Sequence, residues 1–541
     1  MSKQAGTATA VPHEVGAPMS HRQILEALSG ILLGLFVAIL SSTIVSNALP
    51  TILADLHGGE SAYTWVVTST LLAMTASMPI WGKLADLTSK KVLIQSALVI
   101  YIFGSVIAGL AQNTTMLIGA RAIQGLGAGG LSALGQIILA AMVSPRQRGR
   151  YSGYFGAVFA LATVGGPLIG GTIVDTSWLG WRWCFYVGVP IAVIAILVLQ
   201  KTLNLPVVKR HVKVDYLGAF LIAATVSLLL IWVSLAGHNY AWMSWQTAAM
   251  LGGTVLLGAA AIVTETRAAE PVIPLHLFSY RTVTLATLAS VFAGVAMYSG
   301  TTFLSQYFQL SRGASPTKSG LMTMPMVLGL FVSSMVSGQL ISRFGKWKRF
   351  LVIGTGLLAI GIGLMGTLRV DTNYWLHAVF MLLTGLGLGM TMQNLVLAVQ
   401  NTVPVGELGA GSSVVSFFRT MGGAIGVSAF GAVLANKVSG YLTDNLAAAH
   451  VDPTSAAALQ GGGIPNLHTL PAQVVPLVKD AYGHAIGDIF LYAAPFALVG
   501  FVVVWFIKEV ALRTQSGNER AETKAADGAA GTDDADLVTT R

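Results

Sequence analysis

Residues 156–171 read GAVFALATVGGPLIGG, a stretch that is apolar throughout yet contains five glycines and a proline. In water it would be a poor helix, because each glycine costs about 1 kcal/mol and proline about 3 kcal/mol relative to alanine. Inside a lipid bilayer the backbone must satisfy its hydrogen bonds within the segment, so a helix is still expected. The spacing of Ala162, Gly166 and Gly170 leaves one face small enough for a second helix to approach closely. The stretch therefore predicts a bendable membrane helix at a seam between helices, which serves either motion or tight packing alone.

The composition of the whole chain agrees with a membrane location. Of its 541 residues, 54% are hydrophobic and only 10% are charged, whereas soluble domains contain about 25% charged residues. The formal charge of +9 includes no run of basic residues with interleaved aromatics, so nucleic acid is not expected as a partner. The single cysteine, Cys184, excludes an internal disulfide and a cysteine cluster for a metal.

Apolar runs of about 18 to 25 residues, the length that crosses a bilayer, recur fourteen times in the sequence. The run at 61–82 is the least apolar of them, because several threonines and a serine dilute it. The sequence therefore predicts an all-α polytopic membrane protein. The predicted spans are 24–46, 61–82, 92–111, 115–140, 150–174, 181–200, 214–235, 244–264, 283–306, 319–342, 350–368, 375–398, 408–435 and 484–507.

The distribution of Lys and Arg predicts the orientation of these spans. Most of the basic residues lie in alternate loops, and these loops include both ends of the chain. Because loops rich in Lys and Arg stay on the cytoplasmic side, we expect a multi-pass protein of the plasma (inner) membrane with both termini in the cytoplasm. Residues 1–23 are then a cytoplasmic tail, and the first span is too long for a cleaved signal peptide. The composition of residues 508–541 predicts a disordered cytoplasmic tail.

Two patterns recur in the same order in both halves of the chain. The run GKLADLTSKK that begins at Gly82 matches GQLISRFGKWK at Gly338, and GLGAG at Gly125 matches GLGLG at Gly385. Such self-similarity indicates a duplicated unit, and an even number of inserted helices keeps both units in the same orientation. The predicted domains are an N-terminal six-helix bundle at 24–200, a linker with two extra transmembrane helices at 201–282, and a C-terminal six-helix bundle at 283–507 with an outer loop at 436–483.

These patterns resemble those of the major facilitator superfamily, in its fourteen-helix drug:proton antiporter branch. The resemblance is also carried by LSSTIVSNALP at 40–50 and by WRW at 181–183. It implies a major facilitator fold of two six-helix bundles plus two inserted central helices. It also implies that the protein exports drugs by alternating access and that protons drive the export. The residues that match the superfamily's other motifs are Gly82, Leu84, Asp86, Lys90, Lys91, Arg121, Gln124, Gly125, Gly127, Gly166, Pro167, Gly170 and Gly171.

The resemblance also implies which partners to expect. These are a lipophilic small-molecule substrate, protons and the lipid bilayer, and we expect a monomer without enzyme activity. Residues 125–130 spell GxGxxG, but a dinucleotide site needs a preceding strand and a following soluble helix. No cofactor and no metal are therefore predicted.

The hairpin after span 61–82 is the predicted cytoplasmic gate. The carboxylate of Asp86 can cap a helix end or pair with a cation on a neighbouring loop, such as Arg148. In the superfamily this contact holds the two halves together on the cytoplasmic side, whereas a solvated basic loop is the alternative. The predicted gate residues are Gly82, Asp86, Lys90, Lys91 and Arg148.

Arg121 is the candidate for proton coupling. A charge at membrane depth costs about 2.5 to 3.5 kcal/mol on insertion scales, so it usually pairs or lines a water-filled path. The superfamily assigns this arginine to proton coupling, and pairing with backbone carbonyls is the alternative. In many relatives an aspartate of the first helix occupies the position of Ser41. The remaining candidates for the proton carrier are Asp55, Asp175 and Asp488, of which Asp488 is either a proton-exchanging group or an anchor at the outer end.

A substrate pocket is expected midway between the halves. Methionine, aromatic and polar side chains adapt to varied lipophilic shapes, although ordinary packing is the alternative for each. Export of a lipid or an endogenous secondary metabolite is a second hypothesis, and a membrane scaffold or enzyme is a third. The sequence offers no catalytic cluster and no paired carboxylates at a shared depth for an enzyme. The pocket candidates are Ser41, Gln124, Met297, Tyr298, Gln306, Met324, Met392, Gln393, Asn394 and Arg419.

Overall fold

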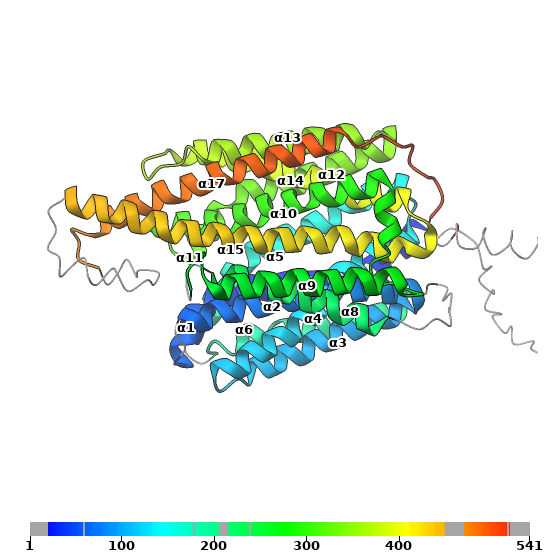
Figure 1. Cartoon of the computed structure of the whole chain (residues 1–541), viewed down its shortest axis with the longest axis horizontal. Coiled ribbons are helices and arrows are strands. Elements are labelled where there is room, and N and C mark those ends of the chain that lie inside the picture. Colours follow the sequence, from blue (N-terminus) through cyan, green and yellow to red (C-terminus); the bar gives the residue numbers. More distant parts are fainter. Residues whose placement is uncertain are drawn as a thin grey trace, which may run out of the picture.

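The computed structural model describes residues 20–57, 60–176, 179–203, 205, 215–236, 240–448, 470–516 and 519. Almost all of these residues lie in helices, which run side by side as one elongated bundle (Figure 1). The β structure in this part of the chain is one isolated bridge between Ala236 and Tyr240. The predicted all-α fold class is therefore confirmed.

The first six predicted spans correspond to seven helices. The sixth span is divided, because Pro190 lies in the first turn of its longer part, where the backbone N–H groups have no partner within the helix and proline is tolerated. The helices are α1 (His21–Asp55), α2 (Glu60–Leu87), α3 (Lys90–Gly109), α4 (Thr114–Met142), α5 (Pro145–Asp175), α6 (Trp183–Tyr186) and α7 (Gly188–Thr202).

Two inserted helices follow, and then the second set of spans. The predicted span 319–342 is divided between two helices at Thr323, just before Pro325 in the first turn of the second. The inserted helices are α8 (Tyr216–Leu235) and α9 (Trp245–Arg267). The rest of the described chain forms η1 (Leu275–Ser279), α10 (Arg281–Gln306), η2 (Tyr307–Ser311), α11 (Pro316–Met322), α12 (Met324–Phe344), α13 (Lys348–Met365), α14 (Tyr374–Thr402), η3 (Val405–Glu407), α15 (Leu408–Ala448) and α17 (Val475–Trp505).

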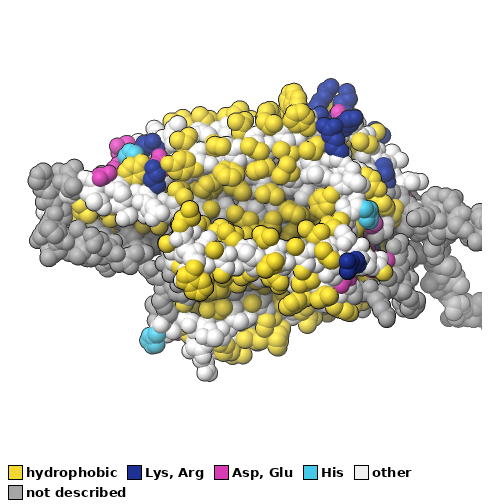
Figure 2. Space-filling model, in the orientation of Figure 1, with side chains coloured by type: hydrophobic (Ala, Val, Ile, Leu, Met, Phe, Trp, Pro, Cys, Tyr) yellow, Lys and Arg dark blue, Asp and Glu magenta, His cyan; other side chains and the backbone are white. Residues whose placement is uncertain are grey.

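The helices have the lengths and surfaces of membrane spans. Among the described residues, 13 helical segments are long and apolar enough to cross a membrane. Helix α2 corresponds to the remaining predicted span and is not among these 13, because polar residues such as the buried Ser69, Thr70 and Thr75 lower its hydropathy. Hydrophobic side chains cover the middle of the face shown in Figure 2, and charged side chains gather toward the two ends. This is the pattern of a belt in contact with lipid.

The two halves pack their helices in the same way. α2 and α3 pack on α4 as α12 and α13 pack on α14, and α1 packs on α5 as α10 packs on α15. Asn113 caps α4 and Asn373 caps α14, each accepting a hydrogen bond from a backbone N–H of the first turn (2.8 and 2.9 Å). Between the halves, α2 packs on α15 and α5 packs on α12. These two pairs are equivalent under the repeat, so the halves meet along a seam with two matched parts.

Three predicted boundaries are wrong. The outer loop at 436–483 is shorter than predicted, because α15 continues to Ala448 and α17 already begins at Val475. The N-terminal tail ends before residue 23, since α1 begins at His21. The tail predicted to be disordered from residue 508 begins with a bonded segment, in which Trp347 donates to the carbonyl oxygen of Val510 (2.8 Å) and Asn401 to that of Ala511 (3.0 Å). Residues 520–541 and 1–19 lie outside the described residues.

Candidate functional site

At one end of the molecule the two halves touch backbone to backbone. A Cβ atom added at Gly149 on α5 would overlap the carbonyl oxygen of Gly338 on α12, and one added at Gly338 would overlap that of Gly149. In the matched part of the seam, a Cβ at Gly409 on α15 would overlap the carbonyl oxygen of Gly82 on α2. Only glycine permits such an approach. We call this end, defined by Gly82, Gly149, Gly338 and Gly409, the closed end.

Asp86 caps the first turn of α15 across the seam. Its Oδ1 accepts a hydrogen bond from the backbone N–H of Gly409 and its Oδ2 from that of Ala410, both at 2.8 Å. Negative charge is favoured at a helix N-terminus by about 0.3 to 1 kcal/mol, because the helix dipole is positive there. Of the two roles considered for Asp86, the structure has the helix cap, and the capped helix belongs to the other half.

Arg148 forms a second link at the closed end. Its guanidinium donates to the carbonyl oxygens of Ala140 and Val143, both at 2.9 Å, and to Oε1 of Gln400 on α14. The side chain is buried, and hydrogen bonds from an ionised donor are stronger than neutral ones in such surroundings. In these bonds the partner across the seam is Gln400 and not, as predicted, Asp86.

The lysines of the predicted gate lie beside the seam. Lys91 donates from Nζ to the carbonyl oxygen of Gln200 on α7 at 2.7 Å, so it ties the hairpin to its own half. Lys90 is the first residue of α3 and is half-buried. Of the predicted gate residues, those with a direct contact to the other half are therefore Gly82, Asp86 and Arg148.

Arg121 lies on α4 inside the first half, with only 3% of its surface exposed. Its Nη1 donates to Oε1 of Gln124 at 2.5 Å, and the Gln124 amide donates to Oγ of Ser105 at 2.8 Å and of Ser41 at 3.3 Å. Its Nε has no hydrogen-bond partner among the described residues. The cluster thus joins α4 to α1 and α3 around a buried cation whose hydrogen-bond acceptor is a neutral amide.

Ser41 brings two separate predictions together. It was considered as the position of a missing acid and as a pocket residue, and it is buried within hydrogen-bond distance of Gln124. An aspartate at this position would lie beside the Arg121–Gln124 pair and would partly neutralise the cation. Serine contributes only a hydroxyl group, so the Arg121 cluster keeps its positive charge.

The helix that contains the glycine-rich stretch packs closely on α1. A Cβ added at Gly166 would overlap the side chain of Thr43, and one at Gly170 would press on the backbone of Ile44 at 3.3 Å. Thr43 also donates to the carbonyl oxygen of Ala162 at 3.2 Å. The other face of α5 meets the second half, where Pro167 and Gly171 lie against Gly320 and Thr317 of α11. The close approach predicted from the spacing therefore occurs, and its partner is α1.

Replacing Gly166 with alanine is expected to reduce transport by at least about tenfold. The added Cβ forces α1 and α5 apart, and such overpacking costs about 1 to 3 kcal/mol. Gly165→Ala is the matched control, because a Cβ there meets Leu40 at 3.5 Å and Ile169 at 3.9 Å, which are ordinary contact distances. Both variants gain the same helix propensity, so transport assays at equal membrane abundance isolate the contact. Equal transport by the two variants would show that this approach is incidental.

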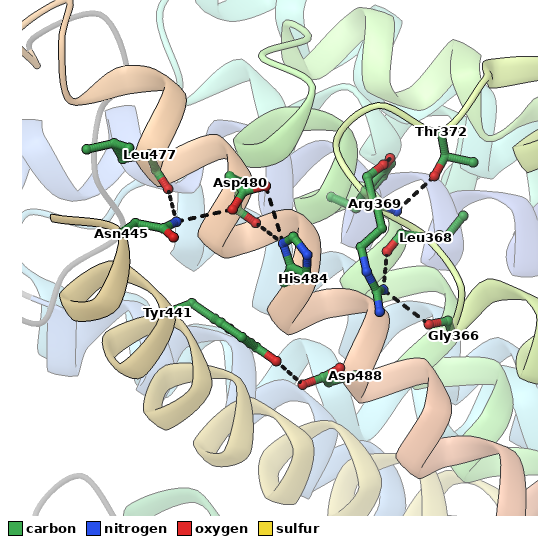
Figure 3. A network of polar contacts seen from close by, with 11 residues as sticks. Gly366, Leu368, Arg369, Thr372, Tyr441, Asn445, Leu477, Asp480, His484 and Asp488 are labelled. Atoms are coloured by element: carbon green, nitrogen blue, oxygen red, sulfur yellow. Dashed lines mark hydrogen bonds and ion pairs between the residues drawn. The ribbon is translucent and has the colours of Figure 1, made fainter. Parts of the chain in front are cut away.

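The candidate proton carriers at the opposite end have structural partners. Asp55 is half-exposed; its Oδ2 accepts from Nε1 of Trp181 at 2.7 Å, and Arg182 lies 3.7 Å away. Asp488 on α17 faces α15, where its Oδ2 accepts from the hydroxyl of Tyr441 at 2.8 Å (Figure 3) and pairs with Nζ of Lys437 at 3.3 Å. These contacts fit the anchoring role for Asp488.

Asp175, the remaining candidate, ends α5, but its side chain lies outside the described residues. Its role as a proton carrier therefore stays a prediction.

The pocket candidates of the second half are spread over four helices. Met297 is part of the hydrophobic core, and Asn394 is buried with its amide donating to the carbonyl oxygen of Met390 at 2.6 Å. Tyr298 packs on α15 at Gly423. No hydrogen bond joins any two of them within the described chain. The half-buried members are Tyr298, Gln306, Met392, Gln393 and Arg419, whereas Met324 is exposed.

Comparisons with known proteins bear on the family and the fold of the chain. The family described as Major Facilitator Superfamily matches residues 31–427. An uncharacterised transporter of this type from Mycobacterium tuberculosis is 36% identical over 92% of this chain and 71% of its own length. The multidrug transporter protein MdtP of Bacillus subtilis is 33% identical over 92% of this chain and 96% of its length. Among solved structures, the proton:xylose symporter XylE has a TM-score of 0.59 at 14% identity, covering 93% of this chain and 100% of that one, which is a likeness of fold.

Proposed function

The chain belongs to the major facilitator superfamily, and from this premise we propose that it exports lipophilic drugs or toxic compounds in exchange for protons. Export proceeds by alternating access, in which the two halves rock against each other and open a shared substrate pocket to one face of the membrane at a time. The relation to a multidrug transporter supports this substrate class.

The observation that carries the proposal is the matched seam at the closed end. The α2–α15 and α5–α12 contacts are equivalent under the repeat, and both rest on glycine backbones together with the Asp86 and Arg148 links. At these glycines backbone meets backbone, so no side chain at those positions has to repack when the halves separate. A rocking motion of the halves therefore opens this end with a small number of polar bonds lost.

The closed end is the cytoplasmic end in this proposal. The loops rich in Lys and Arg lie on this side, which supports a cytoplasmic location of both termini. The membrane in this proposal is the plasma membrane. The structure thus corresponds to a state in which the cytoplasmic entrance is shut, and the pocket candidates between the halves receive substrate only after the seam opens.

Proton exchange supplies the driving force. For one proton per substrate, each pH unit is worth about 1.4 kcal/mol and sustains a roughly tenfold substrate gradient. A membrane potential of 100 mV adds about 2.3 kcal/mol per charge moved. The Arg121 cluster supports this step. A buried cation whose partners are neutral disfavours a second positive charge nearby, so its electrostatic energy depends on whether neighbouring groups carry a proton.

Purified protein in proteoliposomes tests the proposal. With an imposed proton gradient, a lipophilic fluorescent dye is expected to move against its own gradient, and a proton ionophore is expected to abolish this movement. Liposomes that contain the Gly166→Ala variant are the matched control for leakage. Dye movement that is indifferent to both the pH gradient and the membrane potential would contradict proton exchange, and no movement under any gradient would favour a scaffold.

A further inference from the structure

The inserted helix α8 packs on both α2 and α15, the two helices of one part of the seam, and α9 packs on α8. Met78 of α2, Ile222 and Val226 of α8 and Phe417 of α15 belong to one buried hydrophobic cluster. Val272 and Ile273, just after α9, are buried in the same cluster. The insertion is therefore packed against the two helices whose contact closes this end.

Two carboxylates of this insertion lie together near the closed end. Asp215 is the N-cap of α8, and its Oδ1 accepts a hydrogen bond from the backbone N–H of Gly218 at 2.9 Å. Glu265 lies in the last turn of α9 and is only 5% exposed; its Oε2 accepts from the backbone N–H of Ile273 at 2.9 Å. The expectation that no paired carboxylates share a depth is therefore wrong.

The second oxygen of each carboxylate has no donor. Oδ2 of Asp215 and Oε1 of Glu265 are both buried atoms without a hydrogen-bond partner among the described residues. Both oxygens converge on one point, since a single Cβ added at Gly218 would overlap each of them. Two ionised carboxylates in this arrangement repel each other and leave two acceptors unsatisfied.

We propose that Asp215 and Glu265 together form a binding site for one proton. A proton taken from water bonds covalently to one of the two free oxygens, and the resulting O–H donates to the other. The proton satisfies both orphan acceptors and reduces the charge of the pair from −2 to −1. A proton fits better than a metal ion, because no group of three or more His, Cys, Asp or Glu side chains suitable for a metal occurs in the described chain.

Charged neighbours connect this site with α2. Lys83 of α2 acts electrostatically on Glu265 and is paired with Glu270, which follows α9. Arg267 and Asp215 line the same surface pocket, so Asp215 is the member of the pair that lies at the water-accessible surface. Lys83 directly follows Gly82 of the seam, so a change in charge at the pair acts on α2 where it contacts α15.

This inference rests on the proposed function. The site supplies a titrating acid, which is missing from the first helix because Ser41 occupies the position of the aspartate in many relatives. Loss of the proton at the cytoplasmic end restores the second negative charge beside Lys83 and the seam. The inserted helices then do more than fill space between the halves, because they couple the proton to closure of the α2–α15 contact.

Infrared titration of the purified protein in lipid nanodiscs tests the site without substrate or gradient. The wild-type protein is expected to show a carboxylic acid C=O band that persists above the pH at which the exposed carboxylates ionise and disappears as the pH rises further. Glu265→Gln and Asp215→Asn should each remove this band. The glutamine amide supplies the missing donor in the first variant, and asparagine caps a helix as well as aspartate does in the second. Glu26→Gln, which alters an exposed glutamate of α1, should leave the band unchanged.

A band that survives both substitutions at the pair would overturn the proposal. A band abolished at constant pH by Na⁺, K⁺ or Mg²⁺ would overturn it as well, since the site would then bind a metal cation. Because the titration requires no transport, failure of proton-driven export in proteoliposomes leaves its result intact, so the two proposals fail separately.

Discussion

Replacing Arg121 with alanine is expected to lower proton-driven export by at least about tenfold, which corresponds to about 1.4 kcal/mol in the limiting barrier. Arg121 is a buried cation inside the first half, and its Nη1 fixes Gln124 in reach of Ser41 and Ser105. Removal of the charge should not unfold the protein, because a buried arginine costs about 2.5 to 3.5 kcal/mol on insertion scales and no carboxylate hydrogen-bonds to it in the described chain.

Two further variants separate charge from packing at this site. Arg121→Lys keeps the charge but presents a compact ammonium instead of a planar fork, so it should restore part of the export. Arg343→Ala removes an exposed arginine near the closed end and should export like the wild type. Export is measured in proteoliposomes at matched protein content, with thermal stability as the check on folding. Wild-type export by Arg121→Ala would refute a role in coupling.

The helices and the repeat could be predicted from the sequence because the bilayer imposes strong local rules. Backbone groups in lipid must pair within a helix, so apolar length locates the spans. The matching of Gly82 with Gly338 likewise needed only the sequence. Divided spans were missed, because Pro325 was not distinguishable from a proline that merely kinks a longer helix.

The contacts between the halves could not be predicted in the same way. Gly149 and Gly409 look like many other glycines, and only the packing of α5 on α12 and α2 on α15 selects them. Nothing in the sequence around Gln400 indicates that its side chain accepts a hydrogen bond from Arg148. Asp215 and Glu265 were missed for a related reason. Asp215 precedes α8, whereas Glu265 lies in the last turn of α9, so the two are far apart in the sequence. Their common depth follows from the antiparallel pairing of α8 and α9 and not from any local pattern.

The matched seam leads to the second large effect. Gly338→Ala is expected to hold the closed end open, because the new Cβ would overlap the backbone carbonyl of Gly149, and a backbone cannot rotate away as a side chain can. Overpacking of about 1 to 3 kcal/mol shifts an equilibrium between two states by about 5- to 150-fold. Export should fall accordingly, because a transporter that rarely shuts one end cannot complete its cycle.

Distances between spin labels report this shift directly. Thr88→Cys at the end of α2 and Phe344→Cys at the end of α12 place labels on exposed positions of the two halves, while native Cys184 is buried. Gly338→Ala should lengthen the label separation relative to wild type. Gly363→Ala on α13 should not, because a Cβ there meets only Ala494 at 3.9 Å. If Gly338→Ala left both the label distances and export unchanged, the backbone contact would not limit closure, and alternating access through this seam would lose its main support.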